Sequence, residues 1–371
     1  MTKRALITGG AGFIGSHLAD ELLGSGVRVR VLDSLEPQVH GAQRRPPDYL
    51  HADVELVVGD VRDREAVRRA LDGCDVVYHF AASVGVGQSM YRVADYTSVN
   101  NGGTAVLMEA LIERPVERLL VASSMSIYGE GSYQGPDDRV YEQVRRSNAQ
   151  LERGEWEPQL EGGGTLRVVP TPEHKRPDLQ SIYALSKYDQ ERMCFLIGNA
   201  YGISTTAFRF FNVYGTRQAL SNPYTGVLAI FASRLLNDKP PVIFEDGGQR
   251  RDFVHVKDVV RACRLALDAP QAVGKVYNVA SGSSYTIGEV GRRMAGVLGR
   301  QLDPEMSGKY RVGDIRHCVA DIRLARRDLG YEPQVTFEAG LTELAEWLES
   351  QLAVDRVEQM RSELESRGLA R

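Results

Sequence analysis

Tyr183 and Lys187 lie four residues apart in the chain and form the pair best suited to moving a proton. The phenol of tyrosine has a pKa of about 10, so it is a poor base at neutral pH. A lysine on the same helix face stabilises the phenolate, and the pair can then take a proton from a hydroxyl group. Ser124 and Ser126, at the end of a predicted strand, can hydrogen-bond the oxygen that reacts. Because such pairs also occur as ordinary surface pairs, the interpretation depends on what accompanies them.

A glycine-rich segment at residues 8–15, TGGAGFIG, follows a short apolar run and opens an amphipathic pattern. A turn of this kind between a strand and a helix predicts a pyrophosphate site. Gly9 permits the tight turn, Gly12 lets backbone amides approach the ligand, and Gly15 lets the helix pack on the strand. The helix N-terminus adds free N–H groups and partial positive charge. Asp33, about 20 residues further on, can accept hydrogen bonds from an adenosine ribose, which favours NAD over NADP.

Strand and helix patterns alternate along most of the chain. We expect strands at 5–8, 27–33, 54–60, 75–82, 118–124, 205–213 and 275–280, and helices at 14–24, 64–73, 100–112, 181–201, 225–236 and 258–269. This order predicts an α/β fold, a Rossmann-type doubly wound parallel sheet of about seven strands with a smaller α/β substrate-binding lobe. Residues 130–180 interrupt the pattern as a loop-rich insert with one short helix around 140–152, and 338–368 predicts a pair of exposed helices.

The composition excludes several classes of protein. Of the 371 residues, 43% are hydrophobic and 25% are charged, unlike a disordered chain or a coiled coil. A formal net charge of −4 provides no field that would gather nucleic acid. We expect no membrane span and no secretory signal, because no apolar run is long enough. The four cysteines are scattered, which predicts no disulfide framework, no metal site and a cytoplasmic protein.

The motifs, taken in order, resemble those of the extended short-chain dehydrogenase/reductases that act on nucleotide sugars. They are TGGAGFIG, Asp33, GDVRD, HFAAS, SSMSIYG, YALSK, RFFNVYG, EDGGQRRDFVHVKDV, YNVASG and RVGDIRHCVAD. The resemblance covers essentially the whole chain apart from the insert. It implies an enzyme with tightly bound NAD⁺ and a nucleotide-sugar substrate.

The resemblance also implies roles for individual residues. For NAD it implies Gly9, Gly12, Phe13, Ile14, Gly15, Asp33, Asp60, Val61, Phe80, Ala81, Ala82, Asn100, Tyr183, Lys187 and Phe211. For catalysis it implies Tyr183 as acid/base with Lys187, Ser124 on the reacting sugar oxygen, and Ser126 on the same wall. For the nucleotide sugar it implies Ser83, Ser124, Ser126, Asn212, Phe244, Arg251, Arg311 and Asp314, with Phe244 stacking on the base. Helix caps remain the alternative for Asp60 and Asn100, and surface salt bridges for Arg251 and Arg311.

The stretch before Tyr128-Gly129 bears on the reaction. Dehydratases and decarboxylases of this family carry a glutamate where this chain has Ser126, next to Met125. Elimination of water needs an acid and a base there, which serine and methionine do not supply. The resemblance therefore implies a 4-epimerase, which oxidises C4, lets the 4-keto sugar rotate, and reduces it from the other face.

The substrate is less closely defined. The insert and the C-terminal segment resemble a branch that acts on dTDP-6-deoxyhexoses such as dTDP-L-rhamnose. Open alternatives are a UDP-glucose or UDP-uronate 4-epimerase, a 4-keto-sugar reductase that reaches NADP through Arg44 and Arg45, and a catalytically silent NAD-binding regulator. Glu245 replaces the glycine that is common after the stacking aromatic, which leaves the choice of thymine or uracil open.

We expect the chain to divide into two parts. Residues 1–215 together with 259–280 form the predicted NAD-binding Rossmann domain, which carries the insert 130–180. Residues 216–258 and 281–371 form the predicted nucleotide-sugar lobe and the C-terminal helices. The insert is expected to be a lid or substrate wall, with a solvent-facing decoration or a dimer contact as the alternatives. The resemblance further implies a homodimer that packs helices 100–112 and 183–200.

Overall fold

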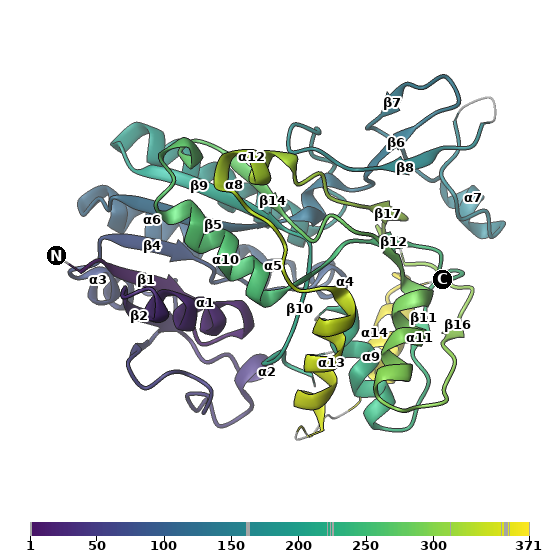
Figure 1. The fold of residues 1–371 in the computed structure, drawn as a ribbon, viewed down its shortest axis with the longest axis horizontal. Coiled ribbons are helices and arrows are strands. Elements are labelled where there is room, and N and C mark those ends of the chain that lie inside the picture. The colour runs from purple at the N-terminus through teal and green to yellow at the C-terminus, as the bar shows by residue number, and fades with distance from the viewer. Residues whose placement is uncertain are drawn as a thin grey trace.

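The computed structural model describes residues 2–160, 164–220, 222, 224, 226–311, 313–349, 351, 355 and 357–370. Its centre is a parallel sheet of seven strands in the order β14-β9-β5-β4-β1-β2-β3 (Figure 1). The strands are β1 (Arg4–Thr8), β2 (Arg28–Asp33), β3 (Glu55–Val58), β4 (Val76–His79), β5 (Arg118–Ser124), β9 (Ser204–Phe210) and β14 (Val276–Val279). Because all of them run the same way, their carboxyl ends meet at one edge of the sheet.

Helices cover both faces of this sheet, because neighbouring strand residues point to opposite sides. One face packs on α1 (Phe13–Gly24), α10 (Val256–Leu267) and α12 (Arg323–Leu329), and the other on α3 (Arg64–Leu71), α6 (Gly103–Glu113) and α8 (Ile182–Tyr201). Within β1, buried Ile7 belongs to the first core and buried Leu6 to the second. The predicted doubly wound Rossmann-type sheet is therefore confirmed.

A smaller group of elements packs around a separate core. It contains α9 (Val227–Leu236), α11 (Ile287–Val297) and α13 (Phe337–Leu348), with the strand pairs β11 (Val242–Ile243) with β16 (Glu305–Met306) and β10 (Asn212–Tyr214) with β13 (Phe253–His255). A third small sheet joins β12 (Arg250–Arg251) to β15 (Tyr285–Thr286) and β17 (His317–Cys318). The C-terminal helix α14 (Val357–Ser366) lies against this group.

Several element bounds differ from those expected from the sequence. The strand expected over 205–213 is two strands, because β9 pairs with β14 while β10 pairs with β13. The helix expected around 140–152 is only α7 (Asn148–Glu152), because residues 140–141 form β7 (Val140–Tyr141). That strand joins β6 (Ser132–Gln134) and β8 (Arg167–Val169) in an antiparallel sheet that was not predicted. Thr225, the expected start of α9, lies outside the described residues.

The helix expected from residue 100 also starts earlier. A short helix α5 (Val93–Tyr96) runs into a π-helical turn, Thr97–Gly102, before α6. Other short pieces are α2 (Pro37–His40), α4 (Val86–Ser89) and the 3₁₀ turns Met125–Tyr128 and Pro270–Ala272. In the part of the chain that the structure describes, no helix has the length and apolar character needed to cross a membrane.

Candidate active site

The glycine loop joins β1 to α1 at the carboxyl edge of the sheet. Gly9 has φ 71°, and a Cβ there would lie 2.9 Å from the backbone of Ala81. A Cβ on Gly15 would lie 2.5 Å from the carbonyl oxygen of Gly9. At Gly12, the N-cap of α1, an added Cβ would meet among the described residues only the Gly9 oxygen, at 3.4 Å. The loop is thus closed toward the protein and open at the helix N-terminus, which fits a pyrophosphate at that end.

Asp33 ends β2 beside this loop and is buried. Its carboxylate accepts hydrogen bonds from the backbone N–H groups of Ala11 (3.0 Å) and Leu35 (2.9 Å). The Nε2 atom of His40 lies 3.8 Å from the same carboxylate. The phenol of Tyr49 donates to the carbonyl of Ala11 at 3.0 Å and closes this side of the loop. A fixed carboxylate at this place suits the ribose hydroxyls of NAD and opposes a 2′-phosphate.

Tyr183 lies in the first turn of α8, which is capped by the hydroxyl of Ser181. Burial raises the pKa of Tyr183, and a hydrogen bond with Ser124 acts in the opposite direction. Ser126 donates its hydroxyl proton to the oxygen of Ser124 at 2.9 Å, and its N–H points to the same oxygen at 3.2 Å. The predicted grouping of the tyrosine with both serines is therefore present as a chain of hydroxyl groups.

Lys187 is one turn further along α8 and is 3% exposed. Burial lowers the pKa of its ammonium to about 8. Its Nζ atom donates to the side-chain oxygen of Gln190 at 2.7 Å, and Gln190 in turn donates to Thr104 at 2.8 Å. His79, whose pKa burial lowers to about 3, is a neutral member of this network between Thr8 and Thr104.

Sequence reasoning missed Gln190, Thr104 and His79. His79 opens the HFAAS motif, but neither that motif nor the sequence around Gln190 and Thr104 gave these residues a role. Their hydrogen bonds fix α8 against β4 and α6. A second buried connection acts from the same helix, where Glu191 pairs with Arg209 at 2.8 Å. Helical spacing is a sequence signal for Gln190 and Glu191, because positions 187, 190, 191 and 194 form the buried face of α8.

The remaining residues implied for NAD follow the carboxyl ends of the strands. Phe13 and Ile14 open α1, Phe80, Ala81 and Ala82 follow β4, and Phe211 follows β9. Asn100 is fully buried and bridges the backbone of Ser83 to the hydroxyl of Ser186, so it also has a structural role. Phe13, Ile14, Phe80, Ala81, Ala82 and Phe211 therefore lie at the same edge of the sheet as the glycine loop.

Asp60 and Val61 are engaged within the protein. The carboxylate of Asp60 accepts two hydrogen bonds from the Arg62 guanidinium, at 2.9 and 2.6 Å, which lower its pKa. Val61 is buried and packs in the core with α3 and α6. The alternative that Asp60 caps the following helix is wrong, because Asp63 is the N-cap of α3.

The other residues implied for the nucleotide sugar, Asn212, Phe244, Arg251, Arg311 and Asp314, lie on the smaller group of elements, whereas Ser83, Ser124 and Ser126 lie at or after the ends of strands of the large sheet. Asn212 donates to the carbonyl of Asp252 at 3.0 Å. The Arg251 guanidinium donates to the carbonyls of Ile315 (2.7 Å) and Arg316 (2.8 Å). These two hydrogen bonds hold the Arg251 guanidinium in place inside the protein. A surface salt bridge, the alternative considered from the sequence, is therefore not its main contact.

Arg311 and Phe244 form a second pair of implied substrate residues. The Arg311 guanidinium lies over the Phe244 ring, 4.9 Å from its centroid, and pairs with Asp314 at 2.7 Å. The Arg311 salt bridge considered from the sequence is present, and it lies inside the implied site rather than on a distant surface.

Glu245, next in the chain, has φ 56°, a left-handed conformation that favours glycine. This explains why glycine suits the position. The carboxylate here is held by Arg146 at 2.7 Å and Arg316 at 2.8 Å, while burial raises its pKa.

The C-terminal segment reaches the same region. Tyr91 and Tyr224 both donate to the carboxylate of Glu363 on α14, at 2.8 and 2.7 Å. Leu369 and Ala370 pack in the cluster that includes Phe244, and Ala370 forms an isolated bridge with Arg311. The segment is thus one side of the implied nucleotide site.

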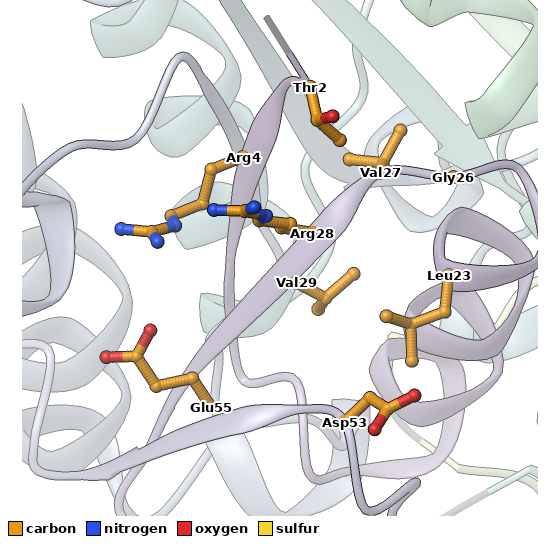
Figure 2. Close-up of a pocket in the computed structure, with 9 residues that line it drawn as sticks. All are labelled: Thr2, Arg4, Leu23, Gly26, Val27, Arg28, Val29, Asp53 and Glu55. Carbon is orange, nitrogen blue, oxygen red and sulfur yellow. The ribbon is translucent and has the colours of Figure 1, made fainter.

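A surface pocket lies at the opposite edge of the sheet (Figure 2). It is lined by Thr2, Arg4, Leu23, Gly26, Val27, Arg28, Val29, Asp53 and Glu55. Arg4, Arg28 and Glu55 are the first residues of β1, β2 and β3. Ligands of open α/β sheets bind outside the carboxyl ends of the strands, so this pocket is not the active site. The described residues contain no group of three or more His, Cys, Asp or Glu side chains that could hold a metal ion.

Comparison with known proteins agrees with this geometry. A family profile described as "NAD dependent epimerase/dehydratase family" matches residues 5–149 and 164–280. The chain belongs to that family. A dTDP-L-rhamnose 4-epimerase of Burkholderia thailandensis is 34% identical over 94% of this chain and 96% of its own length. A putative UDP-glucose 4-epimerase of Methanocaldococcus jannaschii is 28% identical over 93% of this chain and 98% of its own.

Solved structures show the same likeness. The UDP-N-acetylglucosamine 4-epimerase of Methanobrevibacter ruminantium superposes with a TM-score of 0.77 at 29% identity, covering 95% of this chain and 99% of that one. The UDP-glucuronic acid 4-epimerase of Bacillus cereus, solved with UDP-glucuronic acid and NAD, gives 0.76 at 25% identity over 93% and 99%. The predicted family, its NAD cofactor and the predicted class of nucleotide-sugar 4-epimerase are confirmed.

Proposed function

We propose that this epimerase inverts C4 of a dTDP-6-deoxyhexose such as dTDP-L-rhamnose. The observation that carries the proposal is the Tyr183–Ser124–Ser126 chain of hydroxyl groups, one helical turn from a buried lysine and at the same edge of the sheet as the glycine loop. The likeness to a dTDP-L-rhamnose 4-epimerase, 34% identical along nearly the whole chain, supports the choice of sugar and base.

Tyr183, Ser124 and Lys187 have separate roles in the proposed reaction. Tyr183, as phenolate, takes the proton of the C4 hydroxyl, and Ser124 holds the same oxygen while it becomes a carbonyl. Because burial raises the pKa of Tyr183, the phenolate depends on nearby positive charge, which the buried Lys187 one turn away and bound NAD⁺ would supply. The glycine loop and Asp33 would hold NAD⁺, which would supply the hydride acceptor for C4 and then the hydride donor, with the 4-keto sugar turning its other face toward it in between. Tyr183 then returns the proton, so the protein ends the cycle in the state in which it began.

Position 126 supports epimerisation over loss of water. Ser126 donates to Ser124, and Met125 accepts a hydrogen bond from the amide of Asn212 at 3.5 Å. Neither residue carries the carboxylate that elimination across C5 and C6 would require at that place. A 4-keto intermediate formed here would therefore be reduced again rather than dehydrated.

Two other functions are distinguished by specific observations. A UDP-sugar 4-epimerase is supported by the UDP-sugar epimerases among the similar structures, and the substrate test below separates the two. An NADPH-dependent 4-keto-sugar reductase would need a 2′-phosphate site. Arg44 and Arg45 are exposed, whereas the buried carboxylate of Asp33 lies directly beside the glycine loop, which favours NAD.

We also propose that two parts of the chain bind different ligands. Residues 1–215 with 259–280 would bind NAD, and 216–258 with 281–371 would bind the nucleotide sugar. A homodimer would pair α6 and α8, which is supported by the exposed side chains of Leu185 (43%) and Leu196 (61%) on α8. Four unpaired cysteine thiols support a reducing, cytoplasmic setting.

The test is proton NMR of dTDP-L-rhamnose incubated with purified protein and no added cofactor. We expect a second 6-deoxyhexose whose H4 couplings report inversion at C4. Tyr183→Phe is the matched control, because it keeps the ring and removes the acid/base. Conversion of UDP-hexoses or UDP-uronates with none of the dTDP-sugar would replace the proposed substrate. Formation of a 4-keto sugar that requires added NADP⁺ would replace the proposed reaction, because it is a reductase running in reverse.

A further inference from the structure

The implied nucleotide site is built from two short segments, and the insert touches both. One segment carries Phe244 and Glu245, and the other runs from Tyr310 to Asp314. They meet where the Arg311 guanidinium covers the Phe244 ring. The described residues of both segments lie outside the helices, so their relative position depends on the residues packed behind them.

Arg146 of the insert connects the two segments. Its guanidinium donates to the Glu245 carboxylate at 2.7 Å and to the backbone carbonyl of Asp314 at 3.2 Å. It also pairs with Glu130, at the start of the insert, at 3.3 Å. The Arg146 side chain is 3% exposed, whereas that of Arg153, seven positions further on in the same insert, is 58% exposed.

The ion pair with Arg146 explains why a glutamate occupies position 245. Glu245 adopts a left-handed backbone conformation, with φ 56°, that is unfavourable for a non-glycine residue. A carboxylate at that position is stabilised by two guanidinium groups, from Arg146 and Arg316. The exchange of glycine for glutamate is therefore explained by an ion pair to the insert.

Tyr310 is the second point of contact. Its ring lies 6.5 Å from that of Trp156, which belongs to the insert, and the residue is 4% exposed. Within the described residues its hydroxyl has no hydrogen-bond partner. A buried hydroxyl without a partner is costly, and native proteins rarely keep one without a reason. This one belongs to the residue directly before Arg311.

We propose that the insert forms the outer wall of the nucleotide pocket, with Tyr310 donating its hydroxyl hydrogen bond to the bound nucleotide and Arg146 as a positioning residue. Arg146 fixes the Phe244–Glu245 turn relative to the 310–314 segment, and Trp156 supports the Tyr310 ring. The inference rests on the proposed function, because it assumes a nucleoside diphosphate between these segments. It assigns to the insert a part in ligand binding rather than a decorative one.

The test is calorimetric titration of the NAD-containing protein with dTDP and, separately, UDP. Nucleoside diphosphates are used because their binding does not depend on which sugar is turned over. Tyr310→Phe should weaken binding about 3- to 12-fold, the range of one neutral hydrogen bond. The same variant should raise the Tm of the ligand-free protein, because it removes an unpartnered buried hydroxyl. A merely structural tyrosine would give the Tm change without the loss of affinity.

Arg146→Ala should weaken nucleotide binding by more than tenfold and raise KM far more than it lowers kcat. Its matched control is Arg153→Ala, which removes an exposed arginine from the same insert and should change neither. Retention of NAD by both variants shows that the Rossmann sheet is intact. Wild-type affinity in Tyr310→Phe would overturn the inference, even if Arg146→Ala failed to fold. Failure of the wild-type protein to bind either dTDP or UDP would instead overturn the proposed function.

Discussion

The buried ammonium of Lys187 allows a quantitative test of the site. Burial lowers its pKa from 10.5 to about 8. The difference of about 2.5 pKa units corresponds to a penalty of about 3 kcal/mol for the charged form in the folded state, at 1.36 kcal/mol per unit. Lys187→Met removes the titrating group while filling a similar volume. The difference in unfolding free energy between the wild type and this variant therefore reports the penalty for burying the charged lysine.

The sign follows from proton linkage. Below pH 8 the folded and unfolded chains both carry the proton, so the wild type bears the full penalty. Between pH 8 and 10.5 the folded chain releases the proton while the unfolded chain keeps it, and wild-type stability rises relative to the variant. The unfolding free energy of the wild type minus that of Lys187→Met should thus increase by about 3 kcal/mol over that range.

The assay is urea unfolding followed by circular dichroism, at several pH values from 7.5 to about 10.5, on protein stripped of NAD. Loss of the hydrogen bond from Lys187 to Gln190 shifts the difference at every pH and leaves its slope unchanged. A difference that stays flat across the range would refute the reasoning, because it would mean that the amine is solvated in the folded protein.

Three further predictions concern cofactor, catalysis and assembly. Gly12→Ala should keep the unfolding free energy within about 1 kcal/mol and abolish NAD retention, whereas Gly15→Ala, whose Cβ meets the Gly9 carbonyl at 2.5 Å, should itself cost about 1–3 kcal/mol. Released NAD and urea titrations measure both, and an NAD-loaded Gly12→Ala protein would contradict the placement. Tyr183→Phe should reduce turnover by about 10²- to 10⁴-fold with normal NAD content, and near-normal turnover would exclude it as the base. If α6 and α8 form the proposed dimer interface, the wild type should be a dimer in light scattering and Leu196→Glu a monomer, and a variant that remains a dimer would place the interface elsewhere.

The sheet and the glycine loop could be predicted because their signals are local. Strands β1, β3, β4 and β5 of the large sheet contain short apolar runs, and α8 shows a buried face at helical spacing. The three-stranded sheet of the insert could not be predicted, because strands of two or three residues show no periodicity and β6 pairs with β8 across more than 30 residues.

The contacts of the implied nucleotide site are equally nonlocal. Arg146 and Glu245 are 99 positions apart, and nothing in either neighbourhood indicates the other. The only sequence signal was the departure from glycine at 245. Its reason became clear only from the positive φ and the two guanidinium groups around the carboxylate. At Asp60 a local signal was misleading. The sequence made Asp60 a plausible helix cap, but the N-cap of α3 is Asp63, three residues further on.

The central claim is that C4 is inverted by removal and return of the same hydrogen within one active site. The most direct test is incubation of dTDP-L-rhamnose deuterated at C4 with the purified protein in ordinary water, without added cofactor. The account predicts a C4 epimer that retains the deuterium at C4 in full. A product that has exchanged its C4 deuterium for solvent hydrogen would contradict it, because the reaction would then proceed by removal of a proton from carbon.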